Sequence, residues 1–129
     1  MTIQWFPGHM AKAKREVEEK LKLVDFIMEL VDARAPLSSQ NPMLNHVIQK
    51  KTKMIVLMKK DLADPMVTDK WLSYFKEQDI PAIAVDVSNK NDIQKVIQLA
   101  KELGQQKMDK LLKKGIRPRA ARAMIVGIP

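Results

Sequence analysis

Apolar and charged positions alternate along this chain in patterns that predict helices and strands in turn. Apolar residues recur at helical spacing from Met10 to Val24 with charged residues on the opposite side, which predicts an amphipathic helix. Residues 25–32 (DFIMELVD) predict a buried strand that ends before the break at Pro36, and residues 53–58 predict a second strand. The first half of the chain therefore predicts a helix followed by two strands.

Two pairs of a polar residue and a proline predict helix starts. Asn41 precedes Pro42 and Asp64 precedes Pro65, and in each pair the first side chain can cap a helix whose first turn contains the proline. The first pair predicts a short helix over residues 41–48. The second predicts a helix that buries four apolar side chains: Val67, Trp71, Tyr74 and Phe75.

The last third of the chain predicts two more strands with a helix between them. Pro81 opens a short strand over residues 82–86, and residues 123–127 predict a fourth strand. The helix between them carries apolar residues on one face, and Gly104 is expected to end or kink it. That face consists of Ile93, Val96, Ile97, Ala100 and Leu103. Arg117-Pro118 breaks any helix before the fourth strand.

The order of these elements defines the fold class. Strands that alternate with helices predict a parallel sheet with right-handed crossovers. A length of 129 residues with 46% hydrophobic content suits one domain with one buried core. We expect an α/β, doubly wound, mostly parallel sheet of about four strands with helices on both faces.

Composition narrows the classes of protein that the chain can belong to. The sequence has no cysteine, which removes disulfides, thiolate metal sites and cysteine nucleophiles and suits a cytoplasmic protein. No apolar run approaches the roughly 20 residues of a membrane helix, and the N-terminus lacks an apolar signal core. We therefore expect neither export nor a membrane partner, and we predict no metal ligands in this chain.

Positive charge is concentrated near the C-terminus. The chain has 23 Lys and Arg residues against 15 Asp and Glu, a formal net charge of +8. Residues 105–122 contain one acid, Asp109, and seven bases, of which six are predicted RNA ligands: Lys107, Lys110, Lys113, Lys114, Arg117 and Arg119. A solvated helix face is the alternative. The local density favours contact with a phosphate backbone.

Polar residues that follow the second predicted strand form a candidate base-recognition site. In a parallel sheet, ligands bind at the carboxyl ends of the strands. Asp61 could accept two hydrogen bonds from the paired N–H groups of a guanine edge, and the methylenes of Lys59 could cover the base. The pattern x-K-x-D is weak alone and also fits an exposed turn. Its position after a buried strand favours recognition of guanine.

Three segments resemble the bacterial ribosome biogenesis GTPase A family. They are residues 3–13 (IQWFPGHMAKA), residues 31–42 (VDARAPLSSQNP) and residues 118–129. The resemblance implies a permuted P-loop GTPase fold in which base-recognition motifs precede the phosphate loop, with the strands ordered fourth, first, second, third. Residues 1–129 are then the N-terminal part of that domain, ending at the start of the phosphate loop.

The resemblance also implies a function and roles for particular residues. It implies a cytoplasmic GTP hydrolase that binds the large ribosomal subunit and its RNA during assembly. His9 matches the family's catalytic histidine, which replaces the water-orienting glutamine of other GTPases; otherwise it would be interpreted as a helix-capping residue. The guanine-binding positions are Met58, Lys59, Lys60 and Asp61 in one loop and Asp86, Val87 and Ser88 in the next.

Two differences from the family pattern lower the nucleotide affinity expected of this chain. Met58 stands where the family has asparagine, and a thioether is only a weak acceptor. The family pattern continues past Gly-Ile-Pro into the phosphate loop, which also supplies the Mg²⁺ ligand. GTP, GDP and Mg²⁺ are therefore expected in the complete protein, and residues 1–129 alone are expected to bind no nucleotide tightly and to hydrolyse no GTP.

Two other interpretations of the sequence remain open. The chain could be a non-enzymatic, basic RNA-binding scaffold. A flavodoxin-like protein that binds no nucleotide also fits the pattern of strands along the chain, although it leaves residues 5–9 unexplained. In the complete family fold residues 123–127 would form a central strand, whereas in residues 1–129 alone the strands that would pair with its other side are missing. It would then be a sheet edge without a charge to protect it, and we expect self-association through that edge, with fraying of the last residues as the alternative.

Overall fold

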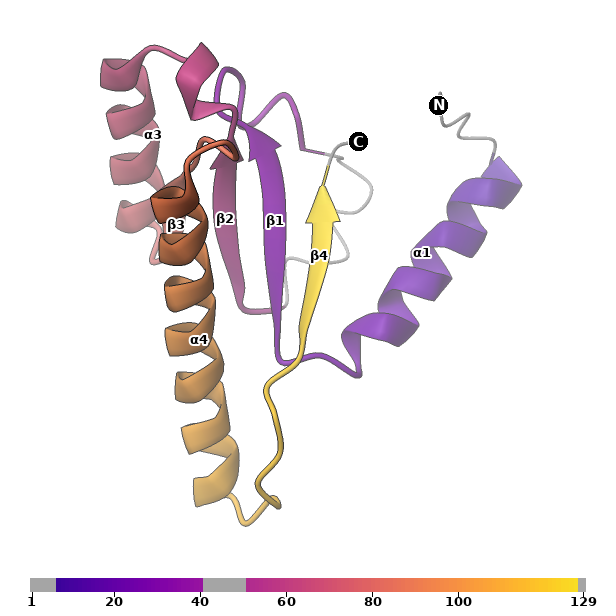
Figure 1. Ribbon diagram of the computed structural model, residues 1–129. Helices are drawn as coiled ribbons and strands as arrows, with labels where there is room; N and C mark the ends of the chain where they lie inside the picture. Colours follow the sequence, from indigo (N-terminus) through magenta and orange to yellow (C-terminus); the bar gives the residue numbers. More distant parts are fainter. Residues whose placement is uncertain (1–6, 41–50, 128–129) are drawn as a thin grey trace.

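The sheet has four parallel strands in the order β3-β2-β1-β4 (Figure 1). The computed structural model describes residues 7–40 and 51–127. The strands are β1 (Phe26–Asp32), β2 (Lys53–Met58), β3 (Ala82–Ala84) and β4 (Ala123–Gly127). Their order confirms the prediction of fourth, first, second, third strand. β3 is two residues shorter than predicted, and the chain leaves the sheet before Asp86.

Three α-helices and one 3-10 helix belong to the described residues. They are α1 (Pro7–Leu21), α3 (Pro65–Glu77), α4 (Lys90–Lys113) and the short η1 (Lys60–Leu62). The helix predicted over residues 41–48 lies outside the described part of the chain. Within the described ranges, no helix combines the length and apolar character needed to cross a membrane.

The helices cover both faces of the sheet. On one face, Phe75 and Trp71 of α3 pack against Val31 and Leu57, and Val17 and Leu21 of α1 pack near Ile27. On the other face, α4 packs against a separate set of strand side chains, because successive residues of a strand point to opposite sides. These are Phe26, Met28, Leu30, Met54 and Val56. The doubly wound architecture predicted from the sequence is confirmed.

Helix α3 starts as predicted but buries a different face. The Asp64 carboxylate accepts a hydrogen bond from the Met66 N–H at 2.9 Å, and Pro65 occupies the first turn. Thr68 and Phe75 are buried, whereas Val67 and Tyr74 are 43% and 38% exposed, so their predicted burial is wrong. The helix presents the stripe that contains Thr68, Leu72 and Phe75 to the core, and the neighbouring stripe stays at the surface.

Helix α4 continues through Gly104 to Lys113, so the predicted end at that residue is wrong. A Cβ at position 104 would lie 2.9 Å from the Ala121 Cβ. The glycine therefore lets the segment that leads into β4 pass close to the helix. Ile93 and Ile97, expected on the buried face, remain partly exposed.

Candidate functional site

The loops that follow β1, β2 and β3 meet at one edge of the sheet (Figure 1). Backbone hydrogen bonds connect them. Ala33 N–H donates to the Met58 carbonyl at 2.7 Å, and Lys60 N–H donates to the Val85 carbonyl at 3.0 Å. The chain thus brings its polar loop residues together at the carboxyl ends of the strands, where doubly wound proteins bind ligands.

The loop after β2 presents two of the predicted guanine-binding residues to solvent. Lys59 has a left-handed backbone with φ of 62° and ψ of 38°, which is uncommon for a residue with a side chain. Lys59 and Asp61 are exposed, and η1 follows directly. The Lys59 ammonium and the Asp61 carboxylate are therefore accessible to a ligand.

The loop after β3 is a turn organised by Asp86. The Asp86 carboxylate accepts hydrogen bonds from Ser88 N–H at 3.0 Å and from Ser88 Oγ–H at 2.6 Å. These bonds, the side-chain one first, hold the pKa of Asp86 below its usual value of 3.8. Val87, between them, is exposed. The turn therefore offers an apolar side chain and backbone groups at the surface.

Asp92 joins these two loops, and sequence reasoning did not identify it. Its side chain is buried, and one oxygen, Oδ2, accepts the Asp86 N–H at 3.0 Å and lies 2.9 Å from Lys60 Nζ. The Asp86 backbone bond and the Lys60 ammonium keep the pKa of Asp92 below its usual value. An acidic residue in the first turn of a helix has a common explanation in the helix dipole, so the sequence pointed to no special role.

A cavity of about 740 Å³ collects residues from both loops, from α3 and from the outer edge of β3. Lys60, Asp61 and Asp86 line it, together with Asp92. Thr68 also lines it, and within the described chain its buried hydroxyl has no hydrogen-bond partner. Three of the predicted guanine-binding residues, Lys60, Asp61 and Asp86, therefore line the cavity. The other four do not line it: Met58, Lys59, Val87 and Ser88.

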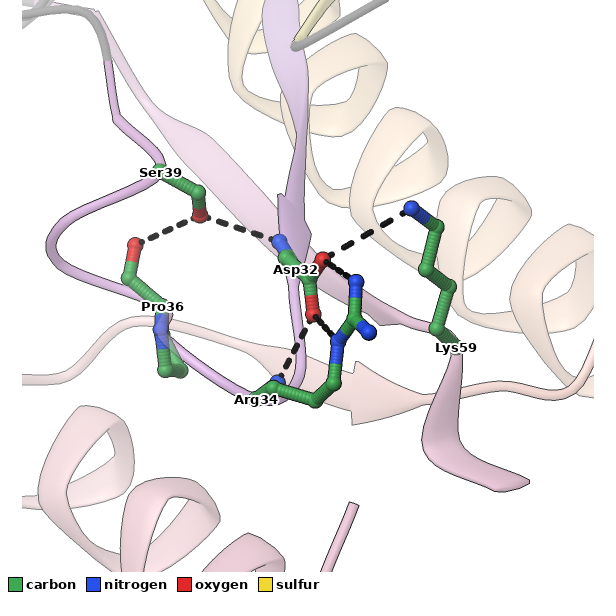
Figure 2. Close-up of polar contacts among 5 residues, drawn as sticks. All are labelled: Asp32, Arg34, Pro36, Ser39 and Lys59. Carbon is green, nitrogen blue, oxygen red and sulfur yellow. Dashed lines mark hydrogen bonds and ion pairs between the residues drawn. The ribbon is translucent and has the colours of Figure 1, made fainter. Parts of the chain in front are cut away.

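The loop after β1 carries an ion-pair cluster centred on Asp32 (Figure 2). Arg34 donates from Nε to Asp32 Oδ1 at 3.0 Å and from NH2 to Oδ2 at 2.7 Å, and its backbone N–H donates to Oδ1 at 2.9 Å. Lys59 Nζ lies 3.7 Å from Oδ2. The Arg34 side chain and then its backbone N–H hold the pKa of Asp32 far below its usual value, so the carboxylate stays ionised.

Ser39 completes the turn around Asp32. Its hydroxyl accepts the Asp32 N–H at 3.0 Å and donates to the Pro36 carbonyl at 3.2 Å (Figure 2). The cluster lies at the end of β1, beside β4, where the strand order reverses direction. In the sequence these residues were named only within residues 31–42, which resemble the GTPase family, and no chemistry was assigned to them. Within the cluster, Asp32 makes the contact with Lys59 and so links this turn to the loop after β2.

The six predicted RNA ligands do not share one environment. Lys110, Lys113, Lys114 and Arg117 are exposed on the last turns of α4 and the loop after it, whereas Lys107 is half-buried. Burial, and then the neighbouring Lys110, lower the pKa of Lys107. Arg119 instead donates from NH1 and NH2 to Asp25 at 2.9 and 2.7 Å. Its guanidinium is thus paired within the protein.

His9, the predicted catalytic residue, belongs to the first turn of α1. Its side chain lies outside the described part of the structure.

Comparison with solved structures identifies the class of fold to which this chain belongs. The fold is similar to the crystal structure of GNP-bound YlqF from T. maritima, with a TM-score of 0.60 and 32% identity over 92% of this chain and 42% of that one. GDP-bound YlqF gives a TM-score of 0.59. The class is thus a permuted P-loop GTPase fold, of which this chain represents a part.

The relatives by sequence agree with the structural comparison. The whole chain is 55% identical to ribosome biogenesis GTPase A of Priestia megaterium, 45% of which it covers. It is 35% identical over 127 residues to the protein of the same name from Thermotoga maritima. The chain therefore matches the N-terminal part of ribosome biogenesis GTPase A and spans about half the length of these relatives. No family model matches it.

Proposed function

We propose that this chain is the base-recognition part of a GTPase that acts in ribosome assembly. The observation that carries the proposal is the meeting of the loops after β2 and β3 at one cavity, with Asp61 and Asp86 in its lining. The relatives named above are ribosome biogenesis GTPases, and the structural neighbours hold guanine nucleotides. The loop chemistry suits the same class of ligand.

Asp61 would select guanine. Its exposed carboxylate can accept hydrogen bonds from two adjacent N–H groups of the guanine edge, whereas adenine presents no such pair. The Lys59 methylenes would cover one face of the base, with the ammonium directed by Asp32. The turn formed by Asp86, Val87 and Ser88 would contact the base from the other loop.

Phosphate and metal chemistry are not assigned to the described residues. No group of three His, Cys, Asp or Glu side chains within those residues could hold a metal ion. The family's Mg²⁺ ligand is expected in the phosphate loop, and we derive no step through that ion. His9 is proposed as the group that orients the attacking water, as the resemblance implies.

Substitutions at Asp61 and Met58 test base recognition. They are made in the full-length protein encoded by the gene for this chain, called here the complete gene product. Asp61→Ala should abolish the preference for GDP over ADP, because the bidentate acceptor is lost. Met58→Asn should tighten GDP binding by restoring an amide to the loop. Asp109→Ala, on the far end of α4, is the control. If both variants match the parent protein in nucleotide titrations, the assignment of this loop is wrong.

A polypeptide of residues 1–129 provides the complementary test. Base contacts alone should give a GDP dissociation constant weaker than about 1 μM, corresponding to less than roughly 8 kcal/mol of binding free energy. We also expect no GTP turnover from this polypeptide. Calorimetric titration with GDP and a phosphate-release assay measure the two quantities, and tighter binding would contradict the division of roles proposed here.

The large ribosomal subunit and its RNA are the proposed partners in the cytoplasm. The basic residues of α4 and the following loop would contact the RNA backbone. Co-sedimentation of the complete gene product with separated ribosomal subunits tests the proposal. Binding to the small subunit alone would contradict it, whereas RNA binding without any nucleotide binding would favour the scaffold alternative.

Self-association through β4 is a separate proposal for the polypeptide of residues 1–129. Among the described residues, β4 pairs only with β1, and Ile125 is 64% exposed on it. Two such edges could pair around a twofold axis and satisfy their free backbone groups. Ile125→Lys should then favour the monomer in sedimentation experiments. A parent polypeptide that stays monomeric at high concentration would exclude this pairing.

A further inference from the structure

We propose that Asp92 is a positioning residue that holds the loops after β2 and β3 at a fixed separation. This inference rests on the proposed function and deepens it, because these loops carry the residues expected to read the base. Asp92 belongs to neither loop. It lies in the first turn of α4 and contacts one residue of each loop.

The geometry of Asp92 is that of a two-sided clamp. The residue is only 4% exposed. The same oxygen, Oδ2, accepts the backbone N–H of Asp86 at 3.0 Å and pairs with Lys60 Nζ at 2.9 Å. Lys60 directly precedes Asp61, and Asp86 opens the turn that ends at Ser88. One carboxylate oxygen thus contacts a residue of each base-contacting loop.

A second set of contacts joins the same two loops. Val85 N–H donates to the Leu57 carbonyl at 2.8 Å and Lys60 N–H donates to the Val85 carbonyl at 3.0 Å, so main-chain bonds hold the two segments together where the loops begin. Asp92 adds one contact with the Lys60 side chain and one with the Asp86 amide, which restrain the loops beyond these main-chain bonds.

The position of Asp92 is itself fixed. Asn89 Oδ1 accepts the N–H groups of Asn91 and Asp92 at 2.9 and 3.4 Å, which anchors the start of α4. Most of the body of α4 then packs on the sheet through Leu103 and its neighbours. The Asp92 carboxylate is therefore attached to the core, whereas the two loops that it contacts are exposed segments.

The negative charge of Asp92 stabilises its contacts with the two loops. A buried carboxylate is costly unless it is paired and hydrogen-bonded, and here both conditions are met. Hydrogen bonds to charged groups are stronger than neutral ones. Moving either loop away from Asp92 would leave a buried charge with one partner, so the paired arrangement is favoured before any ligand binds.

This arrangement predicts an effect on selectivity as well as on affinity. Inosine differs from guanosine only by the missing exocyclic amine, which Asp61 is proposed to bind. If Asp92 fixes the Asp61 loop relative to the Asp86 turn, its loss should loosen the contact with the amine. The ratio of GDP to IDP affinity reports this contact and is insensitive to the fraction of folded protein, because that fraction affects both ligands equally.

Three variants of the complete gene product test the role of Asp92. Asp92→Ala should weaken GDP binding by about tenfold, as expected for one bond to a charged group, and should reduce the GDP to IDP ratio. Asp92→Asn keeps an oxygen for the Asp86 N–H but loses the charge, and should be intermediate. Asp109→Ala removes a carboxylate from the far end of the same helix, where it accepts from Gln105 at 2.8 Å, and should match the parent.

Amide hydrogen exchange provides a readout that does not depend on nucleotide. Asp92→Ala should remove the protection of the Asp86 amide, and Asp109→Ala should preserve it. Unchanged Asp86 exchange, or an unchanged GDP to IDP ratio in a protein that binds GDP, would overturn the positioning role. A parent protein that binds no guanine nucleotide would instead refute the proposed function, and the exchange experiment would still decide whether Asp92 joins the loops.

Discussion

The two ends of the sheet differ in how their charges are compensated. At the carboxyl end, Asp32 is paired with Arg34, and Asp92 with Lys60. At the amino end, the last turns of α4 extend past the strands (Figure 1). Near these turns, within the described residues, the Asp25 carboxylate pairs with the Arg119 guanidinium. Lys110, Lys113 and Lys114 are exposed on those turns.

This difference separates two kinds of recognition. Paired charges with short hydrogen bonds hold loops in one geometry, which is the requirement for reading a base edge. Excess cations on a solvated helix attract a polyanion over about a Debye length and need no fixed geometry. The molecule thus combines an ordered end suited to a small ligand with a cationic end suited to nucleic acid.

The largest expected effect comes from reversing charge at the amino end. If roughly four cations touch phosphates, the log-log slope of RNA affinity against salt should be about −3, or about 60-fold between 50 and 200 mM. Lys113→Glu with Lys114→Glu should weaken binding strongly and flatten the slope. Lys70→Glu with Lys76→Glu on α3 changes the net charge equally and is the control. Equal losses in both variants would mean that net charge alone, not this end, attracts the RNA.

The next effect concerns Asp25, a paired carboxylate at the amino end of the sheet. Asp25 accepts from the Arg119 guanidinium and from the Arg122 N–H at 2.7 Å, which fastens the segment before β4 to the start of β1. Asp25→Ala should lower the free energy of unfolding by about 1 to 2 kcal/mol. Chemical denaturation measures the loss. Arg117→Ala, two residues before Arg119, is the control and should leave stability nearly unchanged.

The Asp25→Ala variant also tests whether Arg119 belongs to the RNA-binding surface. If Arg119 serves the structure, its release from Asp25 should add a free cation and maintain or raise RNA affinity at low salt. A fall in RNA affinity equal to that of the α4 variant would show that the paired arginine belongs to the RNA-binding surface.

The fold was predictable because its determinants are local. The buried strand runs, the Asp64-Pro65 helix start and the break at Pro118 each act over a few residues, and the structure has the corresponding elements. Two local predictions failed where tertiary packing decides. The sequence could not show that α3 would face the sheet with Thr68, or that Gly104 would serve a close approach of Ala121.

The site was predictable only in part, since its connections are long-range. Position after a strand identified Asp61, the family resemblance identified Asp86, and the structure brings both to one cavity. The link between Lys60 and Asp92 joins residues far apart in sequence, and the pair of Arg119 with Asp25 spans almost the whole chain. Such pairs depend on the order of strands in the sheet, which no local pattern specifies.

The smallest expected effect is the acid dependence of the Asp32 cluster at the carboxyl end. The Arg34 side chain lowers the pKa of Asp32 in the folded state, so the cluster stabilises the fold at pH values above the ordinary pKa of 3.8. That stabilisation is lost as the pH falls through the depressed pKa.

Asp32→Asn removes the titrating group and should flatten the decline of unfolding free energy between about pH 4 and pH 2. Arg34→Met removes the cause of the depression and should flatten the same limb. Urea denaturation at a series of pH values measures both slopes, and a steep acid limb that survives in both variants would assign the acid sensitivity to the other carboxylates with lowered pKa, Asp25 at the amino end among them.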